Sequence, residues 1–301
     1  MEEHLKHQHN HWHHHHGEVS HQSVHNLWIS FIVNMLLSVA ELVGGLVAGS
    51  IALIGDALHN TSDAFSILIA LLAFKIGYRK ADKHYTYGFK RAEIIGGFVN
   101  LILLFVSGLY LLAEGVMRLI KPEPVSGELI IWISILALII DVVTAKISHH
   151  DSKHNMNMRM VFLHNLADAL GSIGVIVSGL CIMWFGVYRV DGFVAILIAG
   201  YMIFQAVVAF PDVVNILMNA APKDIDVEKI KARILQIKGV RDVHHIHVWQ
   251  VNEHDISLEC HVKAADVGLL EDIHAVLAQE FDIQHATIQI EHVCHHDHCD
   301  L

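Results

Sequence analysis

Long apolar runs alternate with short polar loops along the first two thirds of the chain. Six of these runs reach the length of about 20 helical residues that is needed to cross a bilayer. They cover approximately Leu27–Ala48, Ile51–Gly77, Ala92–Ile120, Leu129–Ile147, Met158–Phe185 and Val190–Phe210. The pattern therefore predicts an α-helical membrane protein with six transmembrane helices embedded in the lipid bilayer.

The loops between the runs are short, so consecutive helices are expected to form antiparallel hairpins. With six crossings, both termini lie on the same side of the membrane. The two loops on that side hold seven basic residues, namely Arg79, Lys80, Lys83, Lys90, Arg91, Lys153 and Arg159. The opposite side holds three, namely Arg118, Lys121 and Arg189. By the positive-inside rule, we expect cytosolic N- and C-termini in a protein of the cytoplasmic membrane.

After Phe210 the apolar runs give way to charged residues and strand-like alternation. Apolar residues at helical spacing predict two helices, and alternating residues predict three strands. The helices are expected at Asp226–Ile237 and Leu269–Phe281, and the strands at Val240–Val251, Asp255–Val262 and Ala286–Val293. The order α-β-β-α-β suggests a small two-layer α+β domain. The expected division is a His-rich cytosolic segment (1–26), a six-helix transmembrane domain (27–210), a cytosolic α+β domain (211–293) and a Cys/His tail (294–301).

Composition narrows the class of protein. Of the 301 residues, 53% are hydrophobic, and the mean hydropathy of +0.45 is too high for an ordinary soluble domain. The formal net charge of −11 argues against a nucleic-acid partner. Histidine, the commonest metal ligand, occurs 27 times. The four cysteines are too few for a disulfide framework, so we expect reduced thiols.

The most specific signal is a motif that occurs twice, in the second and fifth apolar runs. Both copies read Leu-His-Asn-x-x-Asp, with His59 and Asp63 in the first and His164 and Asp168 in the second. A spacing of four residues places each His and Asp on one helical face, about 6 Å apart. Two facing helices would then supply four N and O ligands, as in a tetrahedral Zn²⁺ site. The alternative is that these polar groups pair with one another and hold the helices together.

Charge and depth favour the metal site. Counted from the ends of their runs, both motifs approach the bilayer midplane, where each ionised carboxylate costs about 2.5–3.5 kcal/mol or more. Two aspartates, two neutral histidines and one divalent cation sum to zero charge. Protons compete with metal for the same ligands, which is a physical basis for proton-coupled antiport. The sequence has no Gly-x-x-x-x-Gly-Lys-Ser/Thr loop for ATP.

On these residues the chain resembles the cation diffusion facilitator family, and in particular its bacterial zinc-exporting branch. Three stretches carry the resemblance: the run from Ser50 to Asp63, Tyr87-Gly-Phe-Lys-Arg-Ala-Glu93, and His164-Asn-Leu-Ala-Asp168. The resemblance implies a homodimer that works by alternating access, with a metallochaperone-like (ferredoxin-like) cytosolic domain. It also implies that His59, Asp63, His164 and Asp168 form the transport site. In the family, two His and two Asp accompany zinc, sometimes with cadmium or cobalt.

Further side chains are candidate metal ligands. In the loop after the second run these are Asp82 and His84, although this chain has Phe89 where some relatives have a His. In the cytosolic domain His244, His261 and His292 match, by position, residues that bind metal in relatives. Strand parity places His244 and His247 on opposite faces of the sheet. For the histidines of the cytosolic domain, the alternative is solvated side chains on an exposed sheet face.

The two ends of the chain are rich in ligand-type residues. The tail can bind Zn²⁺ or Cu⁺ without a fold, through Cys294, His295, His296, His298 and Cys299. Ten histidines lie among the first 25 residues, and three more in the fourth-to-fifth loop, at His149, His150 and His154. We interpret these as low-affinity capture sites, with disordered polar segments as the alternative. Zn²⁺ is thus expected as transported substrate and as regulatory ligand.

Other intramembrane charges leave their roles open. Glu41 and Asp141 are either proton-path or packing residues, and Glu114 is expected to pair with Arg118 near the outer surface. Two other functions are considered. An intramembrane metalloenzyme would keep an open coordination position for water, which four protein ligands do not leave. A membrane-anchored metal sensor or buffer would explain the His-rich ends but not two ligand pairs at the midplane.

Overall fold

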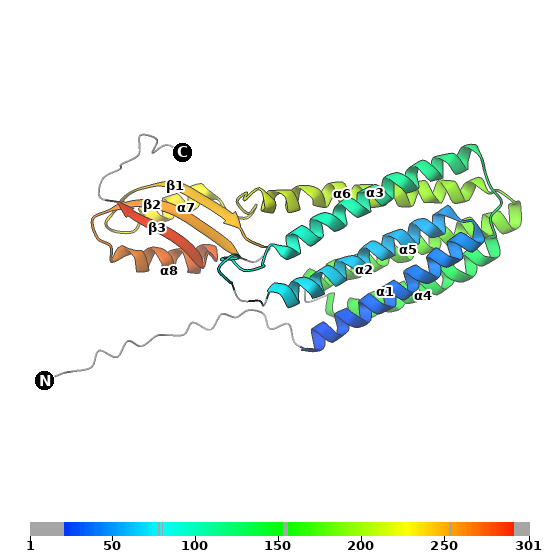
Figure 1. The fold of residues 1–301 in the computed structure, drawn as a ribbon, viewed down its shortest axis with the longest axis horizontal. Coiled ribbons are helices and arrows are strands. Elements are labelled where there is room, and N and C mark those ends of the chain that lie inside the picture. Colours follow the sequence, from blue (N-terminus) through cyan, green and yellow to red (C-terminus); the bar gives the residue numbers. More distant parts are fainter. Residues whose placement is uncertain (1–20, 78, 80, 153–155, 253–254, 292–301) are drawn as a thin grey trace.

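A bundle of long helices and a small sheet domain at one end of it make up the molecule (Figure 1). The computed structural model describes residues 21–77, 79, 81–152, 156–252 and 255–291. Most of the His-rich N-terminal segment, His154, His292 and the whole Cys/His tail therefore lie outside the described residues. The end of the bundle away from the sheet domain is called the distal end below.

Six helices form the bundle: α1 (His21–Ala48), α2 (Ile51–Gly77), α3 (Ala92–Ile120), α4 (Gly127–Ser152), α5 (Met156–Phe185) and α6 (Arg189–Leu217). Within the described residues, five of them, α1 and α3 to α6, are long and apolar enough to cross a membrane. The helix outside this group is α2, which carries three acidic or histidine side chains, Asp56, His59 and Asp63. Asp56 and His59 are among the polar side chains that the bundle buries.

The last helix of the bundle is longer than its apolar run. The predicted end at Phe210 is wrong, because α6 continues through Pro211 to Leu217. Proline lacks the N–H that would donate to the carbonyl four residues earlier, yet long helices tolerate this loss where their neighbours support them. The helix thus extends beyond the apolar run toward the sheet domain.

Glycines let the helices approach each other closely in pairs. A Cβ on Gly192 of α6 would come within 2.8 Å of the carbonyl oxygen of Gly115 in α3. A Cβ on Gly127 of α4 would lie 2.6 Å from the carbonyl oxygen of Gly179 in α5. Such backbone contact between small residues is how helices associate where lipid removes the hydrophobic driving force. The bundle therefore contains the close pairs α3/α6 and α4/α5.

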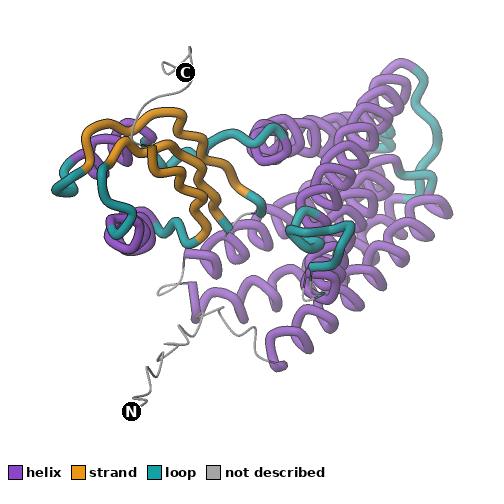
Figure 2. Tube along the Cα trace, turned by 60° about the vertical axis from the view of Figure 1, so that its left-hand side comes forward, coloured by secondary structure: helices purple, strands orange, loops and turns teal. Residues whose placement is uncertain are grey.

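The sheet domain contains α7 (Val227–Leu235), β1 (Val240–Gln250), β2 (Ile256–Ala264), α8 (Leu269–Phe281) and β3 (His285–Glu291), in the predicted order. The three strands lie side by side (Figure 2). Their order in the sheet is β1-β2-β3, with β1 antiparallel and β3 parallel to β2. Both helices share one apolar core with one face of the sheet, where Ile230, Ile273, Leu277, Val243 and Leu258 are buried. The domain thus has one face covered by helices, and its polar side chains point to the other.

A bulge in β1 corrects the predicted strand parity. His244 pairs with His261 and His247 pairs with Glu259, so three steps along β1 match two along β2. His245 lies in this bulge with a φ of 55°. An extra residue in one strand shifts its alternation by one. His244 and His247 therefore share the face away from the core, and the prediction of opposite faces is wrong.

Candidate metal centre

The two copies of the repeated motif meet in the middle of the bundle. His59 and Asp63 project from α2, and His164 and Asp168 from α5. Nε2 of His59 lies 3.5 Å from Asp63 Oδ2 and 3.2 Å from Asp168 Oδ1. Nε2 of His164 lies 3.3 Å from Asp63 Oδ2 and 3.5 Å from Asp168 Oδ2. Each imidazole thus faces both carboxylates, and each carboxylate faces both imidazoles.

These distances match the edges of a coordination tetrahedron. Ligand atoms held about 2.0–2.2 Å from a tetrahedral Zn²⁺ lie roughly 3.3–3.6 Å from one another. The four imidazole–carboxylate separations of 3.2–3.5 Å are thus close to four of the six edges. His59, Asp63 and Asp168 also offer ligand atoms that all lie within 4.8 Å of one another. The site can accept a tetrahedral divalent cation with small side-chain movements.

Exposure divides the site into two halves. The side chains of His59 and Asp168 are 5% and 10% exposed, whereas those of Asp63 and His164 are 23% and 36% exposed. Asp63 follows His59 along α2, and His164 precedes Asp168 along α5, so the more exposed half lies toward the sheet domain. The ring of Tyr201 in α6 lies against the buried half, with its centroid 5.5 Å from that of His59.

A carboxylate from α6 holds the start of α2 in place. Asp191 is fully buried and accepts hydrogen bonds from the Ser50 hydroxyl at 2.5 Å and from the Ile51 N–H at 2.7 Å. The Ser50 hydroxyl also accepts a bond from the Leu53 N–H at 3.1 Å. The first N–H groups of a helix lack partners within it, and a carboxylate there is favourable. Asp191 therefore fixes the depth at which α2 presents its motif.

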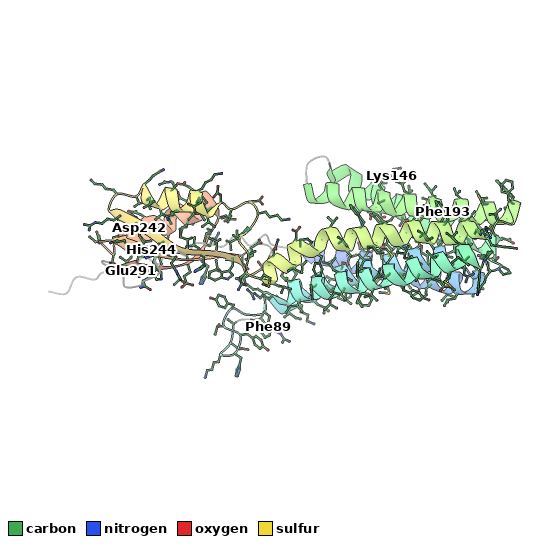
Figure 3. The ribbon with its side chains drawn as sticks, turned by 90° about the horizontal axis from the view of Figure 1, so that it is seen from above. Phe89, Lys146, Phe193, Asp242, His244 and Glu291 are labelled. Atoms are coloured by element: carbon green, nitrogen blue, oxygen red, sulfur yellow. The ribbon has the colours of Figure 1, made fainter. Side chains whose placement is uncertain are left out.

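A second cluster lies on the uncovered face of the sheet. Nδ1 of His261 lies 2.8 Å from Glu291 Oε1, and Nε2 of His244 lies 3.5 Å from Glu291 Oε2. Asp242 approaches the other nitrogen of His244 at 3.2 Å, and Figure 3 shows Asp242, His244 and Glu291 together on the sheet. Two imidazoles and a carboxylate are suited to bind Zn²⁺, with Asp242 orienting one of them.

Glu291 is the ligand candidate that the prediction of this cluster lacked, because His292 was chosen instead. Strand parity contains the signal: Ile288 and Ile290 face the core, so Glu291 faces the same side as His261. His292 lies outside the described residues. The remaining His-rich positions of the sheet extend the cluster, with the rings of His245 and His261 5.0 Å apart.

The other predicted sites are not assembled by the described residues. Asp82 Oδ1 accepts hydrogen bonds from the backbone N–H groups of His84 and Tyr85 at 2.7 and 2.8 Å, so this carboxylate closes a turn. Within the described residues, groups of three or more nearby ligands occur only in the bundle and on the sheet. Phe89 packs on the ring of Tyr85 in the same loop. The tail residues 294–299 lie outside the described residues.

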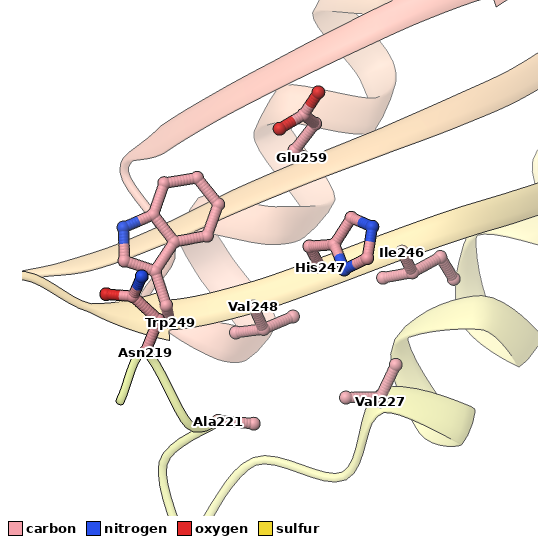
Figure 4. Close-up of a pocket in the computed structure, with 8 residues that line it drawn as sticks. All are labelled: Asn219, Ala221, Val227, Ile246, His247, Val248, Trp249 and Glu259. Atoms are coloured by element: carbon pink, nitrogen blue, oxygen red, sulfur yellow. The ribbon is translucent and has the colours of Figure 1, made fainter. Parts of the chain in front are cut away.

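A pocket of about 480 Å³ lies where the segment after α6 meets the sheet domain, and His247 links its wall to the histidines on the uncovered face of the sheet (Figure 4). Its walls are the segment after α6 and the strands, namely Asn219, Ala221, Val227, Ile246, His247, Val248, Trp249 and Glu259. None of the three ligand candidates His244, His261 and Glu291 lines this pocket.

Comparison with known proteins agrees with both parts of this architecture. A family model described as "Cation efflux transmembrane domain" matches residues 27–218. A second family model, described as "Cation efflux protein, cytoplasmic domain", matches residues 222–293. A cadmium, cobalt and zinc/H(+)-K(+) antiporter of Bacillus velezensis is 32% identical, over 99% of this chain and 96% of its own length. The zinc transporter ZitB of Escherichia coli K12 is 35% identical, over 91% of this chain and 90% of its own.

Among solved structures, the metal-bound C-terminal domain of the CzcD transporter from Cuprividus metallidurans is 33% identical to this chain. The match covers 22% of this chain and 99% of that domain, with a TM-score of 0.21.

Proposed function

The chain belongs to the cation efflux family, also called the cation diffusion facilitator family, and on this premise we propose that it exports Zn²⁺ from the cytosol in exchange for protons. The observation that carries this proposal is the ring of two imidazoles and two carboxylates from α2 and α5, spaced at 3.2–3.5 Å. The names of the relatives add Cd²⁺ and Co²⁺ as further candidate cargo.

The chemistry of the ligands favours zinc. Imidazole suits Zn²⁺, whereas an all-carboxylate site suits harder ions such as Mn²⁺. Metal binds only to deprotonated ligands, so protons and Zn²⁺ exclude each other at His59, Asp63, His164 and Asp168. Loading and unloading the site thus exchanges one divalent cation for protons. Four protein ligands leave no open position for an activated water, so no enzymatic reaction is proposed.

The exposure of the site supports access from the cytosolic side. Its more exposed members, Asp63 and His164, lie toward the sheet domain. With cytosolic termini, as the positive-inside rule predicts, that end of the bundle faces the cytosol. We assign the described conformation to the inward-facing half of an alternating-access cycle, in which all six helices of the bundle, including α2, cross the cytoplasmic membrane.

The sheet domain is assigned two roles. A homodimer held partly through this domain is proposed, and the name of the family model that matches residues 222–293, ZT_dimer, supports it. The His244, His261 and Glu291 cluster is proposed to bind a regulatory Zn²⁺ on the cytosolic side. The division of the chain at residues 26, 210 and 293 and the capture role of its His-rich ends remain predictions.

Zinc flux in reconstituted vesicles tests the proposal. An imposed pH gradient should drive Zn²⁺ across proteoliposomes that contain the wild-type protein. Replacing Asp168→Ala should abolish this flux, because the site loses one ligand and its charge balance, while the protein remains folded in detergent. Asp82→Ala, a matched loss of a carboxylate in the loop, should retain the flux.

The same experiment separates the alternatives. A membrane-anchored sensor or buffer would bind Zn²⁺ but show no flux in the wild-type protein. Full flux in the Asp168→Ala variant would contradict the assignment of the transport site. It would not affect the assignment of the chain to its family.

A further inference from the structure

Three buried carboxylates adjoin the four-residue site on its distal side, and the exchange described above does not use them. Glu41 of α1 is 0% exposed, Asp56 of α2 is 4% exposed and Asp141 of α4 is 7% exposed. Asp56 lies three residues before His59 on α2, about one helical turn nearer the distal end. We call these three side chains the distal carboxylates.

Neutral donors hold two of the distal carboxylates in place. The Asn60 side-chain amide donates to Glu41 Oε2 at 2.8 Å, and the Ser172 hydroxyl donates to Asp141 Oδ2 at 3.0 Å. Ser172 follows Asp168 on α5 by one turn, which again places the contact on the distal side. Three elements of the bundle thus aim their carboxylates at the same region, next to the buried half of the site.

Two of the three groups, Glu41 and Asp56, each retain an oxygen atom whose anionic form the surroundings do not stabilise. Glu41 Oε1 and Asp56 Oδ2 are buried and, among the described residues, have no hydrogen-bond partner. An ionised oxygen without a partner in a water-poor interior is costly, whereas the neutral acid is much less so. Geometry alone therefore favours the protonated form at these positions.

The surrounding acids also favour the protonated form, whereas a positive charge on His59 or His164 would oppose it. Glu41 interacts with the charges of Asp56, Asp141 and Asp168, and Asp56 also with those of Asp63 and His59. Asp141 interacts with the charges of Asp168, His164 and His59. Asp191 of α6, another buried acid of the bundle, is bonded to the start of α2 instead. The groups that face the distal carboxylates are thus acids and the two histidines of the transport site.

Counting charges then indicates whether the distal carboxylates bind protons or a second metal ion. A divalent cation, two aspartates and two neutral histidines in the four-residue site already sum to zero, so the three distal carboxylates have no counter-charge. Three such charges near the midplane would cost about 2.5–3.5 kcal/mol each or more. A second metal ion does not fit, because no three ligand atoms of this set lie within 4.8 Å of one another within the described part of the chain.

We propose that Glu41, Asp56 and Asp141 form a proton-binding site, which stays protonated while the neighbouring site holds its cation and supplies protons when the cation leaves. The proton leaves the O–H bond of a distal acid for the emptied cation site, and a proton from the distal side re-forms that bond. The transfer of protons to the emptied cation site rests on the proposed export function. The protonation of Glu41, Asp56 and Asp141 does not depend on that function.

Infrared difference spectroscopy on the full chain in lipid vesicles detects these protons directly. The C=O stretch of a neutral carboxylic acid is distinct from that of a carboxylate and shifts in D₂O. At neutral pH the wild-type protein should show this band, and Glu41→Gln and Asp141→Asn should each reduce it. Both substitutions keep an oxygen acceptor for Asn60 or Ser172, so the local fold is preserved.

Glu114→Gln is the matched control, since Glu114 lies in α3 near the distal surface, 3.9 Å from Arg118. This substitution should leave the band unchanged. The proposal would be overturned if the wild-type spectrum lacked the band, or if neither Glu41→Gln nor Asp141→Asn reduced it. This test does not require that any variant transports zinc.

Transport assays test the second step of the proposal, in which the distal carboxylates supply protons to the emptied cation site. Zinc uptake and internal pH are recorded together in proteoliposomes at several pH gradients. Glu41→Gln and Asp141→Asn should keep zinc binding but reduce pH-driven flux on the order of 10²-fold, the usual contribution of a positioned proton donor. Flux and pH dependence equal to wild type would overturn the supply role. A wild-type protein that shows the acid band but no zinc flux would refute the export function and leave the proton-binding site standing.

Discussion

At the scale of single residues, we expect His59, the more deeply buried imidazole of the site, to set metal selectivity. His59 touches both aspartates, at 3.5 and 3.2 Å. Replacing His59→Asp would give a site with three carboxylates, which are harder ligands than imidazole. We expect transport to become less selective for Zn²⁺ and to admit other divalent cations.

Competition assays on proteoliposomes check this expectation by comparing Zn²⁺, Cd²⁺ and Mn²⁺ uptake by the wild-type and His59→Asp proteins. Selectivity that is unchanged between zinc and cadmium would show that discrimination is made elsewhere. Asp82→Asn, outside the bundle, serves as the control for nonspecific effects of the substitution.

The buried thiol of the sheet domain is expected to be inert. Burial, with a smaller contribution from Glu259, raises the pKa of the Cys260 thiol to about 12. A raised pKa keeps the thiol neutral at every pH well below that value, and only the thiolate is a good nucleophile or metal ligand. Cys260 therefore does not join the histidine cluster on the opposite face of its strand.

Alkylation measures this inertness. In a Cys181→Ser, Cys294→Ser, Cys299→Ser protein, iodoacetamide at pH 8 should leave Cys260 unmodified until denaturant is added, as read by mass spectrometry. A matched protein that retains Cys299 and has Cys260→Ser reports the reactivity of a thiol elsewhere in the chain. Rapid modification of native Cys260 would contradict its burial.

At the scale of helices, small residues determine how closely the bundle packs. In α6, a Cβ on Gly192 would lie 2.8 Å from the Gly115 carbonyl oxygen, whereas one on Gly200 would meet nothing within 4 Å. Gly192→Ala must push α3 and α6 apart and should lower the melting temperature. Gly200→Ala should be neutral or stabilising by up to about 1 kcal/mol, because alanine favours helix.

Thermal unfolding of both variants in one detergent makes this comparison within a single helix. Equal melting temperatures for the two would mean that the α3/α6 contact does not limit stability. Gly49 illustrates a different need for glycine, since its φ of 72° closes the α1–α2 turn.

At the scale of the whole molecule, contacts across the junction link the loop before α3 to the sheet domain. Lys90 Nζ lies 2.9 Å from Asp255 Oδ2 between β1 and β2, and the ring of Tyr87 lies edge-on to that of His285. Arg91 hydrogen-bonds to Asn219 beyond the end of α6. The Lys90–Asp255 pair is partly exposed, and such pairs contribute about 0–1 kcal/mol. Several weak contacts, rather than one strong one, therefore join the two parts.

Two independent metal sites are expected in one chain. Glu291→Gln removes the carboxylate between His244 and His261, which lies far from the bundle site, so it should lower the zinc bound per chain by one ion. Asp168→Asn should remove another ion. The double variant should lose both, because distant sites are additive.

Zinc content after equilibration at neutral pH, measured by mass spectrometry, tests this additivity. Glu271→Gln, in the first turn of α8, is the control that should bind as much zinc as wild type. If the double variant lost only one zinc ion, as each single variant does, the two clusters would not bind zinc independently.

The sequence by itself determined the helices and the bundle site, because their signals are local. Apolar runs predicted α2 and α3 to the residue, and α-β-β-α-β order was confirmed. A spacing of four placed His59 with Asp63 and His164 with Asp168 before any contact was known. The repetition of that motif predicted that the two pairs would face each other, and the distances agree with it.

Tertiary structure alone decided the features that depend on partners distant in the chain. The bulge at His245 reverses strand parity, and the course of α6 through Pro211 extends a helix beyond its apolar run. The meeting of Glu41, Asp56 and Asp141 joins three helices whose separate sequences give no hint of a common neighbourhood. Periodicity records which face of an element is buried, whereas the packing of whole elements determines which buried groups meet.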